Sequence, residues 1–113
     1  MYGQLKFPIL ANTNHSVVVS GMIEVSGAGA VTHDIHGVES IEVHESNGEG
    51  KIKFKGGVRK IHSVIINIAD SVAAEKVRVV DISEGEVDFI IEDSSAAATE
   101  ACKLSIIAVV ATA

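Results

Sequence analysis

The stretch IEVHESNGEGKIKF, residues 41–54, decides the fold of this chain. Apolar and polar residues alternate on both sides of Asn47-Gly48, the period of a strand with one buried face. A two-residue Asn-Gly loop favours a type I′ turn, because both central positions need positive φ. The sequence therefore predicts a two-faced hairpin that pairs Val43 with Ile52 and Ile41 with Phe54 on one face, and Glu42 with Lys53 and His44 with Lys51 on the other.

A second hairpin is predicted around Ser83–Glu86. A two-residue Glu84-Gly85 turn would place Asp81 opposite Asp88, and like charges directly across a ladder are unfavourable. A four-residue loop separates these acids and pairs Ile82 with Phe89 and Val80 with Ile91, so the longer loop is the prediction. Under the tight turn, Asp81 and Asp88 would become candidates for a shared proton or a cation.

The whole chain repeats this pattern of short apolar runs. Val and Ile dominate the apolar residues, with three Phe and no Trp, and Gly, Ser, Asn and Asp separate the runs. We expect an all-β fold, an antiparallel β-sandwich or barrel of about eight strands with little helix. Two stretches, Asp70–Glu75 and Ser94–Ala101, are read as short helices or loops, with Ser94 or Ser95 as the N-cap of the second. Strands are predicted at Leu5–Leu10, Ser16–Val25, Val38–His44, Lys51–Lys55, His62–Ile68, Lys76–Ile82, Glu86–Glu92 and Lys103–Thr112.

The chain is long enough for one domain. Residues 1–15, which include Pro8, are expected to form an N-terminal arm or edge strand, and residues 16–113 a single β-sandwich domain. The net charge of −6 and the scattered basic residues argue against direct contact with nucleic acid. The longest apolar run, residues 106–111, is too short to span a bilayer, so no membrane partner is expected. The single Cys102 and the lack of a secretory signal predict a protein made in a reducing cytoplasm.

Some predicted strands are apolar on both faces. The last strand is one of them, and Ile65 breaks the alternation of its own strand in the same way. Such a strand is covered either by its own domain or by a neighbouring subunit, and we favour the subunit. The N-terminal arm would add to a partner's sheet edge. The predicted interface residues are Tyr2, Leu5, Phe7, Ile9, Ile65, Leu104, Ile106, Ile107, Val109 and Val110.

No set of residues marks catalysis. His33 and His36 would need a third metal ligand from His15, His44 or Asp34, and paired histidines in a loop are usually solvated. Cys102 lies beside an apolar run, as a buried inert thiol does. The Ser26–Ala30 stretch lacks the third glycine and the Lys-Ser/Thr ending of a phosphate loop. We therefore expect no catalytic residue, no metal and no cofactor, and no enzymatic activity.

Three segments carry a resemblance to a known class of proteins. The segments Gly21–Ser26, Gly37–Ile41 and Gly48–Phe54, followed by a strand pair that turns at Gly85, resemble small all-β virion proteins of tailed bacteriophages. Lys51 and Ile52 stand where those proteins frequently carry an aromatic residue. The resemblance covers roughly Gly21 to Ile91, most of the chain.

That resemblance implies a structural role in a virion. It favours a capsid decoration or cement protein that stabilises the shell and partners the major capsid protein and itself, often as a trimer. The protein would be made in the host bacterial cytoplasm and end in the virion. The alternatives are a tail or fibre component, and a monomeric ligand- or carbohydrate-binding β-module, against which the scarcity of aromatic residues counts.

Overall fold

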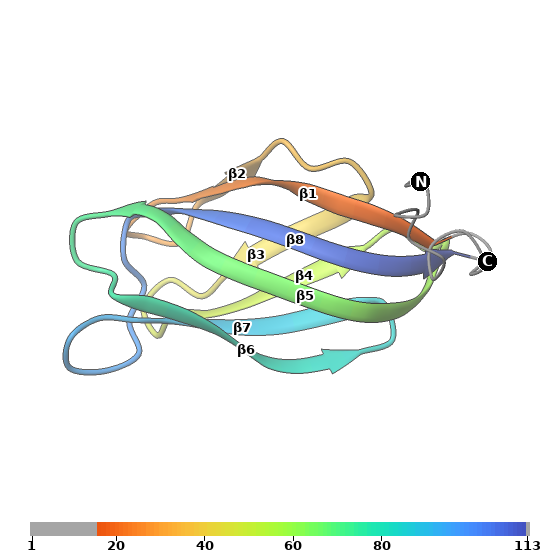
Figure 1. Ribbon diagram of the computed structural model, residues 1–113. Helices are drawn as coiled ribbons and strands as arrows, with labels where there is room; N and C mark the ends of the chain where they lie inside the picture. The colour runs from red at the N-terminus through yellow and green to blue at the C-terminus, as the bar shows by residue number, and fades with distance from the viewer. Residues whose placement is uncertain (1–15, 113) are drawn as a thin grey trace, which may run out of the picture.

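The computed structural model describes residues 16–112, which form eight strands and no helix (Figure 1). No helix in this part of the chain is long and apolar enough to cross a membrane. The predicted strand Leu5–Leu10 and the N-terminal arm lie outside the described residues. The strands are β1 (Ser16–Val25), β2 (Val31–His33), β3 (Val38–Val43), β4 (Glu49–Phe54), β5 (Val58–Ser71), β6 (Lys76–Ser83), β7 (Glu86–Glu92) and β8 (Cys102–Thr112).

The strands form two four-stranded antiparallel sheets, which confirms the predicted all-β sandwich. The first sheet has the order β2-β1-β8-β5 and the second the order β3-β4-β7-β6. In Figure 1 the first sheet lies in front of the second. Alternate residues of each strand point between the sheets, and the largest fully buried side chains there are Phe89, Ile23, Ile52, Ile91, Leu104, Ile106, Val87 and Val110.

The β3–β4 hairpin keeps the predicted faces, but the predicted register is wrong by two residues. Ile41 lies opposite Ile52 and Glu42 opposite Lys51, so apolar still meets apolar and acid still meets base. A shift of two preserves the faces because side chains alternate with a period of two. The turn is a four-residue loop, closed by the N–H of His44 donating to the carbonyl of Glu49 at 2.8 Å.

Side chains of the loop and of a distant segment stabilise this longer turn. His44 Nδ1 accepts the backbone N–H of Ser46 at 3.1 Å, and Asn47 Oδ1 accepts that of Glu49 at 3.0 Å. Thr99 Oγ1 accepts the N–H of Gly48 at 2.9 Å and donates to the carbonyl of His44 at 2.6 Å. These side-chain bonds satisfy the backbone N–H and C=O groups of the loop, which in a two-residue turn would have hydrogen-bonded across the β3–β4 ladder.

The β6–β7 hairpin has the tight turn that the sequence argument rejected. Ser83 pairs with Glu86, which leaves Glu84-Gly85 as a two-residue loop with Gly85 at φ 74°. Asp81 consequently lies opposite Asp88. The prediction gave the repulsion between these acids too much weight: the tight turn forms even though Asp88 is half-buried and its Oδ1 has no hydrogen-bond partner among the described residues. The ladder then shifts register between Val79 and Asp81.

Other differences concern short or irregular segments. Strand β2 was not predicted, and β5 is twice as long as the seven residues expected, so Asp70 and Ser71 are strand rather than helix or loop. The alanine-rich Ser94–Ala101 segment contains no helix and is a loop, the other of the two forms predicted for it. It follows β7 instead, through an isolated bridge between Glu92 and Ala97, because Asp93 holds its start in a turn.

Each edge strand of the two sheets is short or irregular. Strand β2 has three residues. The β3 and β6 ladders each contain one register shift, and the β5 ladder contains three. Bulges of this kind twist an edge and interrupt its row of free backbone groups.

Candidate interaction surface

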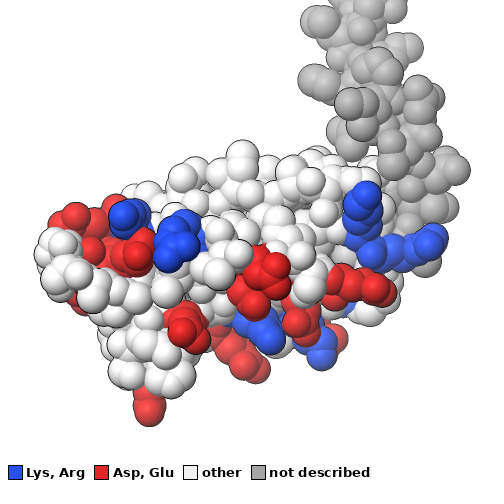
Figure 2. Space-filling model, turned by 90° about the horizontal axis from the view of Figure 1, so that it is seen from below, with Lys and Arg blue, Asp and Glu red and all other residues white. Residues whose placement is uncertain are grey.

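The outer face of the β3-β4-β7-β6 sheet is charged. One row across its four strands consists of Glu42, Lys51, Asp88 and Asp81. Lys51 forms an ion pair with Glu86 at 3.5 Å. Figure 2 shows acidic and basic side chains interspersed over one side of the molecule, with an uncharged stretch along the upper margin of the view. Mixed, solvated charge of this kind favours solubility rather than a dry contact.

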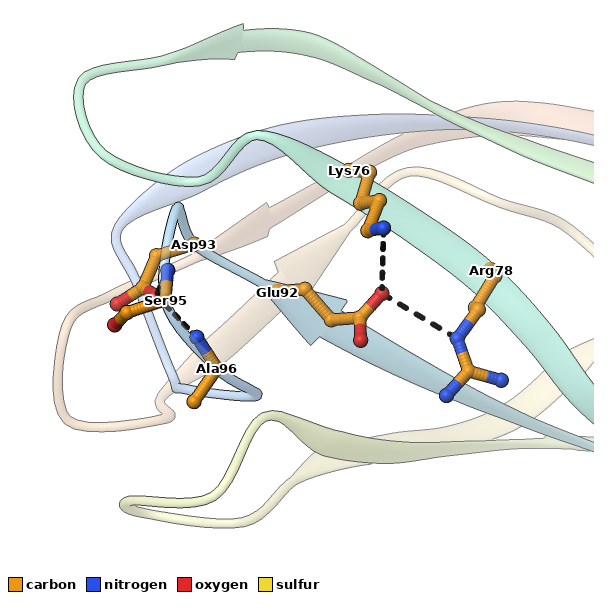
Figure 3. A network of polar contacts seen from close by, with 6 residues as sticks. All are labelled: Lys76, Arg78, Glu92, Asp93, Ser95 and Ala96. Carbon is orange, nitrogen blue, oxygen red and sulfur yellow. Dashed lines mark hydrogen bonds and ion pairs between the residues drawn. The ribbon is translucent and has the colours of Figure 1, made fainter.

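At one end of this sheet, Glu92 on β7 joins two basic side chains of β6 (Figure 3). Its Oε1 lies 3.8 Å from Lys76 Nζ and 3.3 Å from Arg78 Nε. The next residue, Asp93, accepts the backbone N–H groups of Ser95 at 2.8 Å and of Ala96 at 2.9 Å. These backbone donors, Ala96 first, lower the pKa of Asp93 from 3.8 to about 2. Both groups fix the strand end and have no catalytic geometry.

The outer face of the other sheet carries a group of four exposed apolar side chains, while Val80 and Ile82 are exposed on β6 of the charged sheet. We call the outward residues of β1, β8 and β5 the β1-β8-β5 face. Ile65 is 58% exposed, Ile107 54%, Val18 54% and Met22 39%. The register places Ile107 between Ser20 and Ile65, with Val109 beside Val18. These apolar side chains form one patch across three neighbouring strands.

Small uncharged residues fill the other positions of the three central rows, and charges lie at the two ends and beside Met22, whose backbone N–H donates to Asp34 Oδ1 at 2.9 Å. Ser20, Ser63, Ser105 and Asn67 occupy the remaining central positions. At one end a row joins Glu24, Lys103 and Asp70, in which Lys103 Nζ lies 3.7 Å from Glu24 Oε2. At the other end the row consists of Ser16, Ala111 and Lys60. An apolar centre that lacks charge, inside a polar rim, is the composition of a protein–protein contact.

The structure divides the predicted interface residues into three groups. Ile65 and Ile107 are exposed and Val109 is half-buried, all on the β1-β8-β5 face. Leu104, Ile106 and Val110 are at most 1% exposed, because they point into the domain's own core. These three therefore leave the candidate surface, which corrects the prediction that a neighbouring subunit covers them. Tyr2, Leu5, Phe7 and Ile9 lie outside the described residues.

Sequence reasoning missed two members of the patch, Val18 and Met22. The signal was present in Val17-Val18-Val19, where three successive Val place apolar side chains on both faces of one strand. Val19 is buried and Val18 is exposed. The same rule that singled out Ile65 would have found Val18.

Of the residues considered for metal binding, His15 lies outside the described residues, and the others form no group of three within them. His33 Nδ1 accepts the N–H of Ile35 at 3.2 Å, and Asp34 Oδ1 accepts that of Met22 at 2.9 Å. Asp81 and Asp88 face each other, but two carboxylates fall short of the oxygen ligands that Ca²⁺ takes. No group of three or more His, Cys, Asp and Glu within residues 16–112 is placed to hold a metal.

Cys102 is buried at the start of β8. Burial first, and then the nearby charge of Glu100, raise the pKa of its thiol. A raised pKa lowers the fraction of reactive thiolate, which is the opposite of what a nucleophile needs.

The hollows of the surface are shallow. One of about 470 Å³ lies at the Glu24, Asp70 and Lys103 end of the β1-β8-β5 face, and another of about 610 Å³ lies over the charged sheet near Lys51 and Asp88. No aromatic side chain lines the first, and Phe89 in the second is a core residue that is 1% exposed.

No protein-family model, no curated protein and no solved structure matches the chain.

Proposed function

We propose that this protein is a structural component of a tailed-bacteriophage virion, a capsid decoration or cement protein that works by non-enzymatic contact. The observation that carries the proposal is the β1-β8-β5 face, whose centre holds five apolar side chains and no charge. A domain that works alone in water gains nothing from exposing Ile65 and Ile107 side by side in the middle of a sheet. Another protein molecule covers this face in the assembled state.

The energetic contribution of such a contact follows from the area that it removes from water. Burying a whole Ile side chain contributes about 1.5–3 kcal/mol, so covering the exposed half of Ile65 or Ile107 contributes about 1 kcal/mol each. Repeated over many copies on a shell, modest contacts of this size stabilise the particle through multivalency. The small hydroxyl and amide residues around the patch can hydrogen-bond at the rim without the desolvation cost of charges.

The link to a phage particle comes from the sequence segments Gly21–Ser26, Gly37–Ile41 and Gly48–Phe54. In the structure these segments fall in β1, β3 and the β3–β4 hairpin with its turn. They supply turns and alternating strands rather than a ligand site, which fits a module whose function is its shape. The partners under this proposal are the major capsid protein and other copies of the chain.

The test is the copy number of the chain in purified virions of the phage that encodes it. Quantitative mass spectrometry should find the chain at a copy number comparable to that of the major capsid protein. A few copies per particle would assign it to the tail or a fibre instead, and its absence from the particle would refute a virion role.

A second experiment asks whether the N-terminal segment binds the shell. Deletion of residues 2–10 should lower the occupancy of the chain on particles and the temperature at which the shell opens. Unchanged occupancy would leave shell binding to the described domain alone. The matched control is a particle assembled without the chain, which sets the lower limit of shell stability.

A further inference from the structure

The β1-β8-β5 face has an internal symmetry that appears when its residues are arranged in rows. Five rows cross β1, β8 and β5 in the same order. The middle row holds Ile107 and Ile65, the next rows outward hold Val18 on one side and Met22 on the other, and the end rows hold Lys60 and Asp70. The full rows are Ser16-Ala111-Lys60, Val18-Val109-Ser63, Ser20-Ile107-Ile65, Met22-Ser105-Asn67 and Glu24-Lys103-Asp70.

We infer that this face binds the same face of a second copy, about a two-fold axis that lies between the two sheets and runs along the middle row. Such an axis keeps each strand over its own counterpart and reverses the order of the rows. Isologous contacts of this kind require a surface that is complementary to itself. The inference rests on the proposed function in one respect only, namely that another protein molecule covers the β1-β8-β5 face. It adds that this molecule is a second copy of the same chain.

The reversed order of the rows matches chemistry on β5, on β1 and on the axis, whereas on β8 Val109 meets the partner's Ser105 and Ala111 meets the partner's Lys103. On β5, Lys60 meets the partner's Asp70, and because the axis is two-fold this ion pair occurs twice. On β1, Val18 meets the partner's Met22. On the axis, Ile107, Ile65 and Ser20 each meet their own counterparts. Face-to-face sheets pack about 10 Å apart, a distance that apolar side chains of this size fill.

The charges at the ends support this axis over the alternative one. An axis parallel to the strands would instead place β1 over the partner's β5 without reversing the rows. Asp70 would then face the partner's Glu24, and Ile65 would face the partner's Ser20. Under the proposed axis, Glu24 already has Lys103 as its ion-pair partner at 3.7 Å and faces only a small serine. Among the described residues, Lys60 and Asp70 form no ion pair within the chain.

The size of the face sets the strength of the contact. Three strands spaced about 4.8 Å apart and about ten residues long at 3.3 Å each cover roughly 500 Å². Two such faces bury roughly 1,000 Å², the lower end of specific interfaces. An interface of this size is expected to give a weak dimer in solution, which strengthens when copies are concentrated on a shell.

The experiment measures self-association of the purified full chain by sedimentation equilibrium over micromolar to millimolar concentrations. The wild-type chain should pass from monomer to dimer. Ile107→Glu places two carboxylates against each other on the axis and should raise the Kd at least about a hundredfold. Val80→Glu is the matched control, because Val80 is also 54% exposed but lies on β6 of the other sheet, and it should leave the Kd unchanged.

A charge exchange tests the axis itself. Lys60→Glu and Asp70→Lys should each raise the Kd about tenfold, and the double variant should restore it, because the reversed pairs are again opposite in sign. A monomer at all concentrations, a trimer, a dimer that tolerates Ile107→Glu, or a double variant no better than the singles would overturn the inference. The copy number in virions is a separate measurement, so the dimer and the virion role can fail independently.

Discussion

The contact between Gly50 and Phe89 gives the sharpest prediction about the core. Gly50 on β4 lies opposite Phe89 on β7, and its missing side chain would point into the core. A Cβ at position 50 would lie 2.6 Å from Phe89 Cε1 and Cε2, and nearer still to Cζ. Phe89 is 1% exposed, so the ring could move away only by displacing its neighbours in the core or by entering an internal gap. Gly50→Ala should therefore destabilise the domain.

The expected magnitude combines two opposing effects. Forcing a methyl group into a packed core costs about 1–3 kcal/mol. Replacing Gly by Ala at an ordinary backbone conformation returns about 0.4–1 kcal/mol by restricting the unfolded chain. The net loss in the free energy of unfolding is about 1–2 kcal/mol, and each 1 kcal/mol lowers the Tm of a domain of this size by about 4–8 °C.

The assay is urea denaturation followed by far-UV circular dichroism, since the chain has no Trp to report by fluorescence. In a Phe89→Leu background the ring is gone, so Gly50→Ala should become neutral or slightly stabilising, with a coupling energy of about 1–3 kcal/mol. Gly57→Ala is the control, because no atom lies within 4 Å of a Cβ at that position. If Gly50→Ala were harmless in the wild-type chain, or equally harmful in both backgrounds, the packing argument would be refuted.

Three further predictions concern turns and charges. Gly48→Ala should lower the free energy of unfolding by more than about 2 kcal/mol, measured by the same denaturation, because φ is 76° and a Cβ would strike the carbonyl of Ile91. Asp93→Asn should remove part of the acid dependence of the Tm. The folded state lowers the pKa of Asp93 from 3.8 to about 2, so the carboxylate stabilises the fold above about pH 4, and this stabilisation is lost as the pH falls toward 2. A Tm profile of the variant that parallels the wild type over this range would contradict that account. Asp81→Asn should raise the free energy of unfolding by about 0.2–1 kcal/mol by removing the repulsion with Asp88, and the gain should shrink in high salt; no gain at low salt would count against repulsion across this pair.

The faces of the strands could be predicted from the sequence because they depend only on alternation. Ile41 and Ile52 point into the core as expected, although the register is shifted. The shift itself could not be predicted locally, because Thr99, far along the chain, contributes two of the hydrogen bonds that hold the longer turn. A turn chosen by tertiary contacts overrides the preference of an Asn-Gly pair.

The candidate surface was predicted only in part for a similar reason. Ile65 and Ile107 could be identified because each interrupts an alternating pattern. The sequence could not settle whether Leu104 and Ile106 belong to the domain's own core. When a strand is apolar on both faces, its sequence does not reveal which face its own domain covers. The opposed pair of Lys60 and Asp70 emerges only once the register of β5 against β8 is known, since bulges change their spacing.

The broken edges of both sheets have a consequence for how the protein behaves when it is abundant. Segments rich in Val and Ile, such as 64–66 and 106–110, have the composition that forms amyloid when an unpaired strand recruits another chain. Strand β8, which holds the second segment, lies inside its sheet, and register shifts lie on both sides of the first segment in the edge strand β5. We therefore expect the folded domain to recruit other chains at this edge less readily than an uninterrupted edge strand would.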